Sequence, residues 1–257
     1  MSRPRRAMLR GGSAIVGICL TLAACASDPT APAAPGSEVG TRIDVPLPAR
    51  LAALPLRTST GATLTLSSLH GKVVALSDAM TLCQQTCPMD TAAVVQTARM
   101  VDAAGSGNGV VFLSLTVDPQ RDDQAQLAAY RALFSPPPSN WLTLTGTVAE
   151  VDAIWDYLGV WRQKVAEPSG PSPTNWLTGA PLTYDVQHSD EVFFFGSDGH
   201  ERFILEGPPH VTTGQVPRTL LGFMDAAGHS GLSAPPVTDW TSAQARDVIR
   251  WLGTPSP

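Results

Sequence analysis

Two cysteines four residues apart are the side chains of this sequence best suited to chemistry. Cys83 and Cys87 stand in the segment Thr81-Leu-Cys-Gln-Gln-Thr-Cys-Pro88. In a helical turn, side chains four residues apart lie on one face, so the two thiols are expected to converge. Pro88 favours the first turn of a helix, where free N–H groups and the helix dipole stabilise a thiolate. Such a pair can bind a soft cation such as Cu(I), exchange disulfides or form a permanent disulfide, and the spacing leaves all three open.

The cysteine pair is expected between a buried strand and a helix. Residues 73–76 are a short apolar run, and residues 90–104 carry small apolar side chains at helical spacing. The pattern further predicts a hairpin over 56–69, strands over 110–117, 141–144, 192–195 and 202–205, and helices over 124–134, 148–158, 215–226 and 241–252. This order predicts an α/β protein with a thioredoxin-like fold, a central mixed β-sheet flanked by helices. Residues 167–183 contain four prolines and no periodicity, so they are expected to form a long loop.

The first 24 residues have the pattern of a bacterial export signal. Four arginines precede an apolar stretch of roughly ten residues, which is too short to cross a bilayer because a spanning helix needs about 20. The segment Leu22-Ala-Ala-Cys25 follows and resembles a lipobox, in which the cysteine is acylated and becomes the first residue of the mature protein. We therefore expect Cys25 to be lipidated. The arginine pair at positions 5 and 6 leaves general and twin-arginine export both open.

Composition and charge exclude several classes of protein. Removing residues 1–24, with their four arginines, leaves 13 basic and 22 acidic side chains, a formal charge of −9. A chain this acidic offers no electrostatic footprint for nucleic acid and no polybasic membrane patch. Hydrophobic residues make up 43% of the sequence, enough for a sizeable core. Because Cys19 and Cys25 belong to the export signal, the folded part keeps one cysteine pair, too few for a disulfide scaffold.

The sequence divides into four parts. Residues 1–24 are expected to be a lipoprotein signal peptide, and residues 25–48, rich in Pro, Ala, Gly and Ser, a flexible tether. Residues 49–229 are expected to form the thioredoxin-like domain, and residues 230–257 a C-terminal extension with a short helix. The mature protein is expected at the cell membrane, lipid-anchored on its extracytoplasmic face.

Four motifs, in order, resemble the SCO/SenC family, the copper-delivery factors of cytochrome c oxidase assembly. They are Cys83-x-x-x-Cys87-Pro88, the run Ser-Leu-Thr-Val-Asp-Pro-Gln-Arg-Asp over 114–122, Leu-Thr-Gly-Thr over 144–147 and Tyr-Asp-Val-Gln-His-Ser over 184–189. The resemblance extends from about Leu56 to Phe223. It implies that Cys83, Cys87 and His188 bind copper, as Cu(I) or Cu(II).

The sequence departs from the family pattern at three points. Asp78-Ala-Met-Thr81 replaces a usually aromatic-rich approach to the first cysteine, and Gln84 stands where proline is usual. Gln187 replaces an acidic residue before the histidine. An outer carboxylate orients a metal-binding histidine, so this last change predicts weaker orientation of His188.

The resemblance implies a copper metallochaperone, a binding protein rather than an enzyme. It would deliver one copper ion to the Cu(A) centre of a cytochrome c oxidase subunit, or to another copper carrier. The alternative is an extracytoplasmic thiol-disulfide oxidoreductase acting on cysteines of the oxidase or of another copper protein. A thiol peroxidase is less consistent with the sequence, because peroxidatic cysteines usually follow a threonine by three residues, and Met80 and Gln84 occupy those positions here.

The remaining sulfur, imidazole and carboxylate groups near the motifs are expected to be structural. Met80 and Met89 are expected to fill the core. The other histidines are expected on turns and loops: His70, His200, His210 and His229. Of these, only His210 could be brought to the site by a movement of its loop. Asp118 and Asp122 are expected to cap the helix that follows them, with orientation of the site as the alternative.

Overall fold

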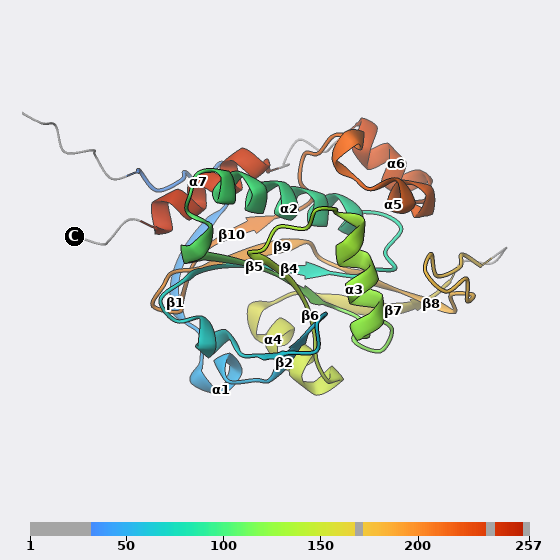
Figure 1. Cartoon of the computed structure of the whole chain (residues 1–257), viewed down its shortest axis with the longest axis horizontal. Coiled ribbons are helices and arrows are strands. Elements are labelled where there is room, and N and C mark those ends of the chain that lie inside the picture. The colour runs from blue at the N-terminus through green and yellow to red at the C-terminus, as the bar shows by residue number, and fades with distance from the viewer. Residues whose placement is uncertain (1–31, 168–171, 235–239, 254–257) are drawn as a thin grey trace, which may run out of the picture. The chain divides into compact units, whose positions relative to one another are not determined.

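A mixed eight-stranded sheet forms the centre of the computed structural model, which describes residues 32–167, 172–234 and 240–253 (Figure 1). The strand order is β1-β10-β9-β4-β5-β6-β2-β3. These strands are β1 (Thr41–Pro46), β2 (Leu56–Thr58), β3 (Thr63–Leu64), β4 (Val73–Ala79), β5 (Val110–Thr116), β6 (Trp141–Thr145), β9 (Glu191–Phe195) and β10 (His200–Glu206). Strands β4, β5 and β6 are parallel, whereas β9 runs antiparallel to β4 and β10 antiparallel to β9. The predicted α/β class and thioredoxin-like fold are confirmed.

Helices cover both faces of this sheet, each over its own apolar core. One face carries α2 (Cys87–Ala103), α3 (Gln124–Leu133) and α7 (Ser242–Leu252), and the other carries α1 (Ala49–Ala52) and α4 (Val148–Leu158). After β10 the chain forms α5 (Arg218–Phe223) and α6 (Ala226–Ser233), at the upper right of Figure 1. The described residues also contain three short 3₁₀ turns: η1 (Leu66–Leu69), η2 (Gly107–Gly109) and η3 (Thr213–Gln215).

Burial on both faces explains the apolar central strands. All seven residues of β4 and all seven of β5 are buried, as expected of parallel strands covered by helices on each side. Two polar residues of β4, Ser77 and Asp78, are buried with the rest. The Asp78 carboxylate therefore needs partners within the protein, because an unpaired buried charge is costly.

The folded unit begins earlier than the sequence indicated. Residues 41–46, predicted as part of the 25–48 tether, form β1 and pair antiparallel with β10. The prediction is wrong for this segment because its partner strand lies far away in the sequence and most of its side chains are exposed. Residues 1–31, which include the predicted signal peptide and Cys25, lie outside the described residues.

The helix of the predicted C-terminal extension packs into the domain. Helix α7, expected as the short helix of 230–257, buries Ala245, Val248 and Ile249 in the core on the α2 face. The helix predicted over 215–226 is instead divided, because Met224 adopts an extended conformation between α5 and α6. Within the parts of the chain that the structure describes, no helix has the length and apolar character to span a membrane.

A two-stranded hairpin absent from the sequence prediction lies beside the central sheet. Strand β7 (Arg162–Ala166) pairs antiparallel with β8 (Tyr184–His188). The predicted loop 167–183 connects them, and its described part folds back on the domain, because Trp176 donates a hydrogen bond from Nε1 to the carbonyl of Thr81 at 2.7 Å. This hairpin positions the histidine of the candidate site.

Candidate metal centre

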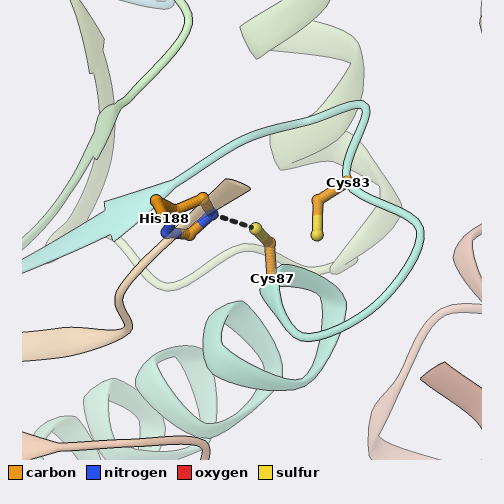
Figure 2. A group of neighbouring side chains, drawn as sticks. All are labelled: Cys83, Cys87 and His188. Carbon is orange, nitrogen blue, oxygen red and sulfur yellow. Dashed lines mark hydrogen bonds between the residues drawn. The ribbon is translucent and has the colours of Figure 1, made fainter. Parts of the chain in front are cut away.

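Three elements bring two thiols and one imidazole together. Cys83 lies on the loop after β4, Cys87 is the first residue of α2, and His188 is the last residue of β8. Figure 2 shows the imidazole facing the sulfur of Cys87, and the Nε2–Sγ distance is 3.1 Å. One donor atom from each residue lies within 4.8 Å of the other two. The three residues singled out in the sequence thus form one cluster, with His188 at the end of a strand, β8, that the sequence pattern did not predict.

A buried carboxylate holds the start of the cysteine loop, the segment between β4 and α2 that carries Cys83. Asp122 is fully buried and accepts hydrogen bonds from the backbone N–H of Thr81 at 3.2 Å, from its hydroxyl, and from the hydroxyl of Thr116 at 2.6 Å. It therefore ties the loop to the end of β5. The expectation that Asp122 caps the next helix is wrong, because Asp123 caps α3 instead, accepting from Gln126 N at 2.8 Å.

Asp118 likewise acts beside the site rather than as a cap. Its carboxylate pairs with Arg121 and accepts a hydrogen bond from the hydroxyl of Tyr184, the first residue of β8, at 3.1 Å. The guanidinium of Arg121 also lies over the Tyr184 ring, 3.8 Å from its centroid. These contacts fasten the β7–β8 hairpin, and with it His188, to the end of β5.

The two thiols differ in protonation. Both are free and buried, with 8% of Cys83 and 1% of Cys87 exposed. A hydrogen bond from Cys87 lowers the pKa of Cys83 well below its usual value against the opposing effect of burial, and the nearby His188 acts in the same direction. Burial, together with the neighbouring Cys83 sulfur, raises the pKa of Cys87 well above its usual value. Of the two sulfurs, Cys83 is therefore the one that favours the thiolate form and Cys87 the one that favours the thiol.

A carboxylate of β4 orients His188. Nδ1 of the imidazole lies 3.0 Å from Oδ2 of Asp78 and 2.9 Å from the backbone oxygen of Ser189, and both are acceptors. In the neutral, ligating form of the ring the proton therefore belongs on Nδ1, which leaves the Nε2 lone pair facing the thiols. Oδ1 of Asp78 is held by the N–H of Glu191 at 2.8 Å.

The prediction that Gln187 leaves His188 more weakly oriented is therefore wrong. Asp78, distant in the sequence, supplies the carboxylate, whereas Gln187 is exposed. The signal that could have revealed this is an aspartate inside the largely apolar strand Val73–Ala79, five residues before the first cysteine.

Further carboxylates lie behind the imidazole. Asp190 Oδ1 is 3.7 Å from Nδ1 of His188, and burial raises its pKa to about 6. Burial also raises the pKa of Glu191, to about 7, and that of Asp90. Asp78, His188 and Asp190 form a second group that satisfies the distances for a metal ion. Because Nδ1 faces these carboxylates and Nε2 faces the sulfurs, the thiol side of the ring offers the soft donor set.

The remaining sequence candidates stay outside the cluster of thiols and imidazole. Met80 and Met89 are buried in the apolar cores, as expected. His200 pairs with Asp44 at 2.8 Å on the surface. The other three histidines are exposed: His70, His210 and His229.

Metal binding to this cluster near neutral pH is expected to release about two protons, since thiol and imidazolium protons must leave when these groups ligate a metal. With the pKa of Cys83 lowered and that of Cys87 raised, one proton is expected to come from Cys87. The second comes from His188: burial lowers its pKa, but Asp78 and the Cys83 sulfur outweigh this effect and raise the pKa well above its usual value. Titration calorimetry in buffers of different ionisation enthalpy measures the number, and a value near one would contradict a protonated His188.

Comparison with known proteins shows similarity over a segment that extends well beyond these three residues. Residues 53–213 match the family model described as SCO1/SenC. The chain is 26% identical over 144 residues to the human mitochondrial SCO1 homolog, covering 56% of this chain and 43% of the relative. It is 29% identical over 134 residues to the Mus musculus mitochondrial SCO2 homolog, covering 52% of this chain and 47% of the relative. The chain thus spans less than half the length of these curated relatives.

A solved structure shares the fold. A crystal structure of a protein from Aquifex aeolicus VF5 superposes with a TM-score of 0.51 at 16% identity, covering 72% of this chain and 96% of that one. At this identity the likeness concerns the fold alone. The family model, in contrast, covers more than half of the 257 residues and includes both cysteines and His188. The chain therefore belongs to the SCO1/SenC family.

Proposed function

We propose that the protein is a copper metallochaperone, a binding protein that holds one copper ion through Cys83, Cys87 and His188. The convergence of these donor atoms within 4.8 Å carries the proposal. Thiolates suit Cu(I), and an imidazole suits Cu(II), so this donor set can hold copper in either state. The family resemblance supports delivery of the ion to the Cu(A) centre of a cytochrome c oxidase, or to another copper carrier.

Anaerobic titration of the reduced protein with Cu(I) tests this function. We expect about one equivalent to bind, because two thiolates and one imidazole complete a single three-coordinate site. Mild oxidation beforehand is expected to join Cys83 to Cys87 and abolish binding. Full binding after oxidation, or none before it, would contradict the proposed site.

The thiolate on Cys83 favours a second candidate function, thiol-disulfide exchange. Cys83 is the more exposed of the two cysteines and the one whose pKa is lowered. Its thiolate would attack a partner's disulfide, and Cys87 would then resolve the mixed disulfide, leaving the partner reduced and the pair oxidised. This chemistry requires no imidazole ligand, so His188 distinguishes the two functions.

The sequence of the export segment supports a membrane anchor. We infer that Cys25 is acylated after removal of residues 1–24, and that the domain faces the extracytoplasmic side of the membrane. Mass spectrometry of the membrane-extracted protein is expected to find lipid on Cys25. A secreted form with an unmodified Cys25 would contradict the anchor.

A further inference from the structure

The start of α6 contacts the loop between the two cysteines. Asp225 donates a hydrogen bond from its backbone N–H to the carbonyl of Gln84 at 2.9 Å. Its Oδ2 accepts a second from Nε2 of Gln85 at 3.0 Å. Its Oδ1 caps α6 by accepting from the N–H of Gly228 at 2.8 Å. Asp225 thus caps the start of α6 and also holds two consecutive residues of the cysteine loop.

The backbone of α6 packs directly on the same loop. A Cβ atom added to Gly228, which is buried, would lie 2.6 Å from the carbonyl oxygen of Gln84 and 3.1 Å from the Cα of Gln85. Only glycine allows this approach, because real Cβ atoms do not come so close to backbone. Asp225 and Gly228 also lie beyond residue 213, where the match to the family model ends. We call their contact with Gln84 and Gln85 the α6 clamp.

The loop is what positions Cys83. Cys87 is fixed as the first residue of α2, whereas Cys83 lies on the loop before it. The backbone N–H of Gln85 donates to the sulfur of Cys83 at 3.4 Å. A contact that fixes Gln84 and Gln85 therefore also fixes the sulfur of Cys83 relative to that of Cys87.

We propose that the α6 clamp, formed by Asp225 and Gly228 on Gln84 and Gln85, holds Cys83 in its ligating position and slows release of Cu(I) from the site. The inference rests on the proposed copper function. Asp225 and Gly228 are positioning residues, because they act on the ion only through the loop. A loop already ordered before binding keeps the ordering cost out of the binding free energy, and the ion leaves only when the loop opens.

Two variants weaken the clamp in different ways. Gln85→Ala removes the hydrogen bond to Asp225 while leaving the cap of α6 intact. Gly228→Ala forces the helix and the loop apart. Gly222→Ala is the matched control, because a Cβ atom there meets nothing within 4 Å. Loss of one or two hydrogen bonds is expected to speed Cu(I) transfer to a chelator about tenfold in the two clamp variants, with unchanged stoichiometry and with the control like the wild type.

A measurement without copper separates this inference from the proposed function. Amide hydrogen exchange of Gln84, Gln85 and Thr86 in the metal-free protein is expected to quicken in both clamp variants and not in Gly222→Ala. If the wild type binds no Cu(I), the proposed function fails while this exchange still reports on the clamp. If exchange and copper transfer stay at wild-type rates in Gln85→Ala and Gly228→Ala, or if exchange rises without faster transfer, the inference is overturned.

Discussion

His188→Ala is expected to lower copper affinity more than a hundredfold, since even a partner outside the ligand set typically contributes ten- to hundredfold. The sulfur-to-Cu(II) charge-transfer absorption is expected to disappear with it. The physical reason is that Nε2, 3.1 Å from the Cys87 sulfur, is the nitrogen donor of the cluster. Two thiolates without it still favour Cu(I) but leave Cu(II) prone to reduction by the sulfurs. Visible absorption and competition with a chelator measure the two effects.

His200→Ala is the matched control for this variant. His200 also pairs through Nδ1 with a carboxylate, that of Asp44 at 2.8 Å, but on the surface and away from the thiols. It is expected to bind copper like the wild type. Thiol-disulfide exchange is expected to change little in either variant, because exchange needs only the cysteines and the largest effect that lowers the pKa of Cys83 is the hydrogen bond from Cys87, not the nearby His188.

Cells separate the two candidate functions. A chaperone with His188→Ala is expected to assemble oxidase poorly when copper is limiting. Full oxidase activity with His188→Ala, combined with its loss in Cys83→Ser, would instead identify the protein as a reductase. His188 would then serve only as a neighbour that stabilises the Cys83 thiolate.

Local sequence patterns are sufficient to predict an element when its own residues determine where it begins and ends. The helix Val148–Leu158 begins and ends where predicted, because Thr147 and Glu150 form a capping box and Gly159 ends it in the left-handed conformation. The cysteine pair was likewise readable, since a strand, a short loop and a proline-led helix follow one another directly.

The features that the sequence does not predict depend on contacts between residues that lie far apart in the chain. In the sequence, β1 resembles a linker and β8 a loop. Only the structure shows that β1 pairs with β10 and that β8 pairs with β7. The sequence does not show the carboxylate partner of His188 for the same reason, because 110 positions separate His188 from Asp78. Periodicity reports which face of an element is buried, but it does not report which elements meet.

Asp78→Asn is expected to weaken copper binding about ten- to hundredfold, the range for partners that orient a ligating histidine. The amide keeps the shape of the carboxylate and its acceptor for the Glu191 N–H. It loses the negative charge 3.0 Å from Nδ1, which makes the imidazole a stronger ligand. The Ser189 carbonyl, still 2.9 Å from Nδ1, limits the loss to less than that of His188→Ala. Asp44→Asn, which alters the corresponding surface pair, is the control.

The pH dependence distinguishes orientation and charge from simple misfolding in Asp78→Asn. The carboxylate raises the pKa of His188, so in the wild type a proton competes with copper for the imidazole up to a higher pH. Removing the charge lowers that pKa and weakens the competition. The affinity deficit of Asp78→Asn is therefore expected to be largest at high pH, where no proton competes in either protein, and to shrink as the pH falls through the raised pKa of the wild type. Proton release on binding should fall from about two toward one near neutral pH. An affinity deficit that is constant across pH, with an unchanged proton count, would mean that Asp78 supports the fold and not the imidazole.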